Sequence, residues 1–240
     1  MAIRLLPFRD YDEHDVVNLY RMDGSKGDFI DLSNAGKRST AKGDAGVFVK
    51  VKNGNLGGNP GDTWDPIDLS TASKDSLLGK SDYPNVGRNV YPQASLTVEA
   101  VDPSNGVAQP VLGVTLRQTV ERDELGENLL YNPVKKDELF GVYPGEAVPV
   151  LSKGMITLTD QAFDGAPSVG DALFPSPAAG TLGCVSGAAY GSIPAGANVV
   201  GTVLASGMRD DNTGSLGGTN VFNNPGYQSG AYYIVKIDCA

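Results

Sequence analysis

Short segments in which apolar and polar residues alternate dominate the last hundred residues of the chain. The clearest is residues 231–239, where alternate positions are apolar: Tyr233, Val235, Ile237 and Cys239. Lys236 and Asp238 occupy the opposite face. A period of two is the pattern of a β-strand with one buried face.

Similar short strands are predicted upstream of this last one, at residues 147–151, 154–159, 171–174, 180–185 and 199–206. Turns rich in Gly, Pro and Ala separate them. Short strands at regular spacing with such turns are typical of a small β-barrel or sandwich. We therefore expect a mainly β fold, with a small barrel or sandwich at the C-terminus.

The first half of the chain contains three further predicted strands, at residues 46–52, 94–101 and 114–120. In the first of them, Val47, Val49 and Val51 alternate with Phe48 and Lys50. Each of the three is predicted to be half-buried, with one face in water.

Two long polar segments interrupt the predicted strands. Residues 53–89 are rich in Gly and Asn and contain Trp64, the only tryptophan, and residues 209–230 contain Phe222 and Tyr227. Loops of this length in a folded domain often carry function, so we expect an interaction loop anchored by Trp64. The alternative is that Trp64 packs against its own domain, as large aromatic side chains commonly do.

Local structure is also predicted at the start of the chain and near Asn132. Residues 1–10 are apolar apart from Arg4, Arg9 and Asp10, and they are predicted to form an extended arm that adds to a neighbour's sheet, or else the first strand of the chain's own fold. Asn132 followed by Pro133 predicts a helix start, with one or two turns to residue 139. The predicted organisation is an arm (1–15), an N-terminal β region with the long loop (16–131) and a C-terminal β-barrel (132–240).

Composition narrows the classes of partner. The formal net charge is -9 and the pI is near 4.6, with basic residues scattered rather than clustered, so nucleic-acid binding is not expected. No stretch approaches the ~20 apolar residues that span a bilayer, and the first residues do not resemble a signal peptide, so we expect a protein made in the cytoplasm of its producing cell, without membrane attachment. Cys184 and Cys239 are expected to be free thiols.

Catalytic and metal-binding patterns are weak. His14 is the single histidine and stands in an acidic run, so a surface histidine is favoured over a catalytic one. One histidine and two distant cysteines do not make a zinc site. Residues 209–214 look like a calcium loop, but Val221 stands where the bidentate Glu would be needed. We expect no enzyme activity, cofactor or metal ion.

Several segments of the last hundred residues, taken in order, resemble one known group of proteins. They are Val148-Pro149-Val150-Leu151-Ser152-Lys153-Gly154, Val169-Gly170-Asp171-Ala172-Leu173-Phe174, Gly180-Thr181-Leu182-Gly183, Val199-Val200-Gly201-Thr202-Val203 and the β-branched last strand. In this order and spacing the chain resembles the small β-barrel head-decoration, or cement, proteins of tailed bacteriophages.

The resemblance implies a virion protein on the outer capsid surface. Such a protein binds the major capsid protein, commonly as a homotrimer, and holds capsid subunits together; a dimer is the alternative for this longer chain. Partner contacts are expected from apolar residues in segments predicted to be exposed: Ile3, Leu5, Leu6, Phe8, Trp64, Phe222 and Tyr227.

Two other functions remain open from the sequence. A receptor- or glycan-binding module of a tail or fibre would use the two long loops for recognition. A tail-tube subunit is the third possibility.

Overall fold

Strands form most of the regular structure, as the sequence predicts. The computed structural model describes residues 4–22, 29–34, 42–51, 97–101, 110–176, 180–186, 193, 198–209 and 230–239. Within these ranges the strands form two six-stranded sheets and one three-stranded sheet. Two 3-10 helices, η1 (Glu13–Asp15) and η6 (Asp160–Ala162), join strands.

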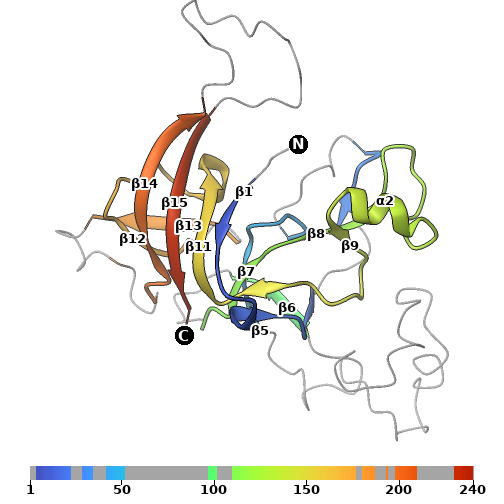
Figure 1. Cartoon of the computed structure of the whole chain (residues 1–240), viewed down its shortest axis with the longest axis horizontal. Coiled ribbons are helices and arrows are strands. Elements are labelled where there is room, and N and C mark those ends of the chain that lie inside the picture. Colours follow the sequence, from blue (N-terminus) through green and yellow to red (C-terminus); the bar gives the residue numbers. More distant parts are fainter. Residues whose placement is uncertain are drawn as a thin grey trace, which may run out of the picture.

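The first sheet contains the C-terminal strands and is antiparallel throughout (Figure 1). Its order is β1-β11-β15-β14-β12-β13. The strands are β1 (Leu5–Asp10), β11 (Lys153–Thr159), β15 (Gly230–Asp238), β14 (Gly201–Arg209), β12 (Ala172–Pro175) and β13 (Leu182–Val185). The predicted alternation of β15 is confirmed, since Tyr233, Val235 and Ile237 are buried while Lys236 is exposed.

The second sheet has the order β2-β10-β7-β5-β6-β3. Its strands are β2 (Val16–Val17), β10 (Val150–Leu151), β7 (Gly113–Thr115), β5 (Phe48–Val51), β6 (Thr97–Ala100) and β3 (Arg21–Met22). All neighbours are antiparallel except β3 and β6, which are parallel.

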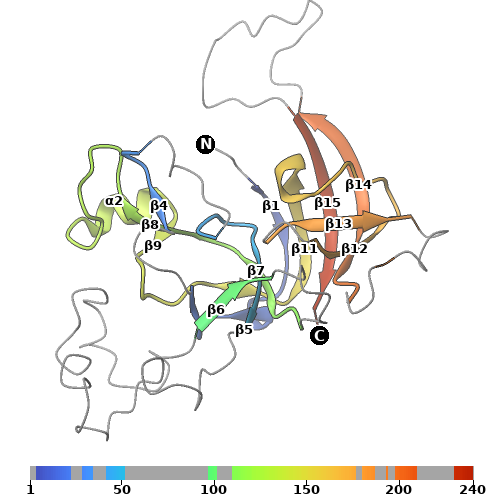
Figure 2. The same ribbon diagram turned by 180° about the vertical axis from the view of Figure 1, so that it is seen from behind.

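The third sheet is small and parallel, with the order β4-β8-β9. Its strands are β4 (Ile30–Asp31), β8 (Gln118–Arg122) and β9 (Gly141–Val142), and helix α2 (Pro133–Glu138) lies between β8 and β9 in the chain. Figures 1 and 2 show this unit on the opposite side of the molecule from β14 and β15.

Strands cross the boundary predicted between residues 131 and 132. β1, from the predicted arm, pairs with β11 in the C-terminal sheet, and β10, from the C-terminal part, pairs with β7 and β2. The largest apolar cluster accordingly joins both halves, for example Leu5 and Phe48 with Leu158 and Ile237. The described part of the arm is therefore the first strand of the chain's own fold, the alternative that the sequence left open.

Two predictions about the first half are wrong in detail. β5 has no wet face at its start: Phe48 packs in the largest cluster, while Val47 and Val49 pack in a second cluster on the other side. The strand predicted at residues 114–120 is two strands in different sheets, because the chain leaves β7 at Leu116, whose amide donates to the Pro149 carbonyl at 2.9 Å, and enters β8 at Gln118.

The predicted helix start is confirmed. The Asn132 side chain accepts a hydrogen bond from the Lys135 amide at 3.3 Å, and Pro133 occupies the first turn. Cys184 and Cys239 are free and partly buried.

Candidate partner-binding surface

The unit formed by β4, β8, β9 and α2 exposes several large apolar side chains. Leu125 is 85% exposed, Tyr131 83%, Phe140 73% and Val134 69%. All four lie between β8 and β9, and we call them the apolar tip. Large apolar side chains this exposed are candidates for contact with a partner.

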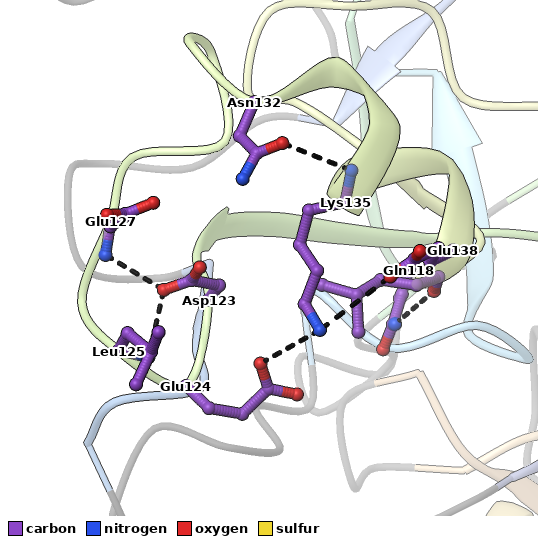
Figure 3. A network of polar contacts seen from close by, with 9 residues as sticks. Gln118, Asp123, Glu124, Leu125, Glu127, Asn132, Lys135 and Glu138 are labelled. Atoms are coloured by element: carbon purple, nitrogen blue, oxygen red, sulfur yellow. Dashed lines mark hydrogen bonds and ion pairs between the residues drawn. The ribbon is translucent and has the colours of Figure 1, made fainter.

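Leu125 is held out by a hydrogen-bonded turn between residues 123 and 127 (Figure 3). The carboxylate of Asp123, which is only 3% exposed, accepts hydrogen bonds from the amides of Leu125 at 2.9 Å and Glu127 at 2.8 Å. Gly126 adopts a φ of 84°, which suits glycine in a tight turn. The backbone that presents Leu125 is therefore already ordered, so little backbone entropy is lost on binding.

The turn is tied to helix α2 by charge. The Lys135 ammonium lies 3.6 Å from Glu124 of the turn and 3.8 Å from Glu138 of the same helix (Figure 3). These pairs are partly exposed, so each contributes little stability. The contact with Glu124 joins the turn to the helix that carries Val134, and the contact with Glu138 lies within the helix.

Tyr131 follows a second tight turn. Its amide donates to the Asn128 carbonyl at 3.1 Å, and the Asn128 side chain accepts from the Leu130 amide at 2.9 Å and donates to the Tyr143 hydroxyl at 3.2 Å. Beneath the turn lies a third apolar cluster, made of Ile30, Leu32, Val120, Leu129 and Tyr143. The tip is thus supported by a small core of its own.

Phe140 is the most informative member of the tip. Its φ is 50°, and it is the single non-glycine residue with a positive φ among the residues that the structure describes. A bulky residue in the left-handed region costs on the order of 1 kcal/mol or more. Because the ring is 73% exposed, burial within the chain does not offset this cost. A strained and exposed aromatic side chain is suited to a contact outside the chain.

The residues predicted to bind a partner have different surroundings. Phe8 is 60% exposed, as predicted, and Leu6 is partly buried. Leu5 was expected to be exposed and is not: it is 6% exposed, because β1 pairs with β11 and turns this side chain into the largest apolar cluster. Ile3, Trp64, Phe222 and Tyr227 lie outside the described residues.

The sequence analysis missed the apolar tip. The available signal was a large apolar residue inside a polar turn: Leu125 stands between Glu124 and Gly126, and Tyr131 directly precedes the helix cap Asn132. Phe140 carries no comparable signal, since its backbone conformation is set by how the end of α2 joins β9.

The structure places the single histidine at the surface. His14 is a surface histidine, with its side chain 86% exposed and Nδ1 2.7 Å from Asp12. Within the described ranges no three His, Cys, Asp or Glu side chains are grouped to hold a metal ion. None of the described helices has the length and apolar character needed to cross a membrane. The calcium-like segment at 210–214 lies outside these ranges.

No protein-family model, no curated protein and no solved structure matches this chain.

Proposed function

We propose that this protein is a non-enzymatic structural component of a tailed-phage virion. In this proposal it binds the outer surface of the capsid and stabilises it by bridging subunits of the major capsid protein. The observation that carries the proposal is the apolar tip, where four large apolar side chains are exposed on an outlying unit and are held by turns, a capped helix and a strained backbone.

The tip suits a protein surface better than a small ligand. Aromatic side chains are common centres of binding energy in protein interfaces, and the tip exposes two of them, Tyr131 and Phe140. Held on a unit that lies away from the large C-terminal sheet, they reach a neighbour while the rest of the fold stays intact (Figure 2).

Self-association follows from the same proposal. A homotrimer, or a dimer as the alternative, would carry several copies of the tip onto one lattice. Each contact after the first is then intramolecular, so modest contacts sum to tight binding.

The strands of the C-terminal part support the resemblance to decoration proteins. The segments that carry it coincide with β10 and the start of β11, with β12, with β13 and with the start of β14. β10 lies in the second sheet and the others lie in the first, and all of them pair with antiparallel neighbours, as in a small β-barrel or sandwich.

The proposal is tested by adding purified protein to capsids that lack it and measuring the bound fraction by sedimentation. Wild type is expected to bind saturably, and the double variant L125S/V134S to bind at least about tenfold more weakly, since two exposed anchors are removed. M208S is the matched control, because Met208 is 72% exposed on β14, away from the tip. Absence of saturable binding, or an equal loss in M208S, would contradict the proposal.

A further inference from the structure

A groove runs along the first strand, on the side of the molecule between β1 and the unit that carries the tip. Its volume is about 760 Å³, and it is open to solvent. Around β1, residues 4–7 and 9–11 line it. The other lining residues are 116–118 at the entry to β8, 139–140 just after α2, and Ala45.

The groove lies beside the irregular start of β1. The register of β1 against β11 shifts between Leu5 and Arg9, and the neighbouring residues Arg4, Leu5, Leu6 and Pro7 all line the groove. β1 is the end strand of its sheet, with β11 on one side and no strand paired on the other among the described residues. A groove beside a free strand edge has the shape of an extended peptide.

The lining is apolar at its base and positive at its rim. Leu6, Leu139 and Phe140 supply apolar surface, Leu116 is only 6% exposed at the base, and Arg9 and Arg117 are exposed. Neither of these two arginines forms an ion pair with a described acidic side chain. The Arg9 Nε donates only to the nearby Leu6 carbonyl, at 3.2 Å.

The lining of the groove is positively charged, whereas the whole chain is negatively charged. The lining contains three arginines and one acidic residue, Asp10, whereas the chain carries a formal net charge of -9. Arg4 is already paired with Asp44, so the free positive charge is that of Arg9 and Arg117. Electrostatic complementarity therefore favours a negatively charged segment in this groove.

We infer that this groove binds an extended segment of a partner protein that carries apolar residues flanked by carboxylates. The apolar residues would lie against Leu6, Leu139 and Phe140, and the carboxylates would accept hydrogen bonds from Arg9 and Arg117. The inference goes beyond the proposed function, because the groove meets the apolar tip only at Phe140 and its binding is measured without capsids.

The test uses the whole 240-residue chain to select peptides from a random library, so no peptide sequence is assumed. A random 12-residue peptide library is panned against wild type, and the best peptide is measured by fluorescence anisotropy. We expect enriched peptides rich in Asp, Glu and apolar residues, bound more weakly as salt increases.

Two charge-matched variants locate the site. R9Q/R117Q is expected to weaken the peptide about fivefold to tenfold, since two partly exposed charge contacts are lost. K153Q/K236Q removes the same charge from β11 and β15 and should bind as wild type does. Hydrogen exchange of wild type with the peptide should show protection at residues 4–11 and 116–118, which gives a readout that does not depend on how the variants fold.

Other results would overturn the inference. These are no enriched peptide, enrichment of basic peptides, equal weakening by both double variants, or protection elsewhere in the chain. Concentration-dependent self-association that R9Q/R117Q abolishes would instead assign the groove to a second copy of this chain and overturn the choice of partner.

Discussion

Arg4 and Asp44 form an ion pair that is almost withdrawn from solvent. The Arg4 Nε lies 3.7 Å from the Asp44 Oδ2, and the two side chains are 10% and 7% exposed. The Arg4 Nη1 also donates to the Gly180 carbonyl at 3.4 Å, whereas its Nε has no hydrogen-bond partner among the residues that the structure describes. The pair fastens the start of β1 to the segment that leads into β5. Since its hydrogen bonding is incomplete, it positions the strand more than it stabilises it.

The Asp44 carboxyl should make stability depend on pH. Burial raises the pKa of Asp44 to about 6, although the positive charge of Arg4 acts in the opposite direction. The folded pKa lies above the ordinary value of 3.8, so this contribution to stability is complete below about pH 4 and is lost as the pH rises through 6. The loss is on the order of 2 to 3 kcal/mol.

Urea unfolding of wild type and D44N at pH 4.5, 6 and 7.5 measures this effect. The stability of D44N relative to wild type is expected to increase with pH, because Asn cannot ionise. A constant difference between the two proteins across this range would show that Asp44 titrates normally.

Gly113 should be intolerant of a side chain. A Cβ at this position would lie 2.1 Å from the backbone carbonyl oxygen of Leu151, where β7 meets β10. G113A is expected to lose at least about 2 kcal/mol of unfolding free energy, because backbone must move. Gly230 is the control, since its Cβ would come no closer than 3.7 Å to Asp160, and G230A should change stability by less than about 0.5 kcal/mol. Similar thermal melts for both variants would refute the close packing of these two strands.

Replacing Phe140 should separate stability from binding. Asn accepts a positive φ more readily than Phe, so F140N is expected to stabilise the fold by about 0.5 to 1 kcal/mol. The same variant should bind capsids more weakly, because it removes an exposed anchor. V134S is the comparison for stability, with a change within about 0.5 kcal/mol. A destabilised F140N with full capsid binding would mean that the ring serves the fold.

Cys239 should react slowly in the folded protein. Burial, with a smaller contribution from the negative charge of Asp238, raises the pKa of its thiol to about 12. Only the thiolate reacts with a disulfide reagent, so at pH 8 modification is expected to be at least roughly tenfold slower than in urea. The measurement uses C184S, which leaves Cys239 as the one thiol. Equal rates in the folded and unfolded protein would contradict the buried position.

Part of the fold was predictable because its signals are local. The alternation of Tyr233, Val235 and Ile237 gave β15, and Asn132 with Pro133 gave the start of α2. These features depend on residues a few positions apart, which the sequence displays directly.

Other parts depend on contacts between distant segments. The sequence predicts that Phe48 and Val49 lie on opposite faces of a strand with one face in water. In the structure each packs in a different apolar cluster, so both faces of β5 are covered at its start. The placement of Leu5 likewise follows from pairing with Leu158 in β11, more than a hundred residues away. The exposure of Phe140 depends on how the end of α2 joins β9.

The central claim is that this protein covers the outside of a phage head. It is tested most directly by immunogold electron microscopy of virions with antibody against this chain. The account predicts label spread over the whole head. Label confined to the tail or its fibres would contradict it and favour a receptor-binding module, and unlabelled virions would show that the protein is not an external part of the particle.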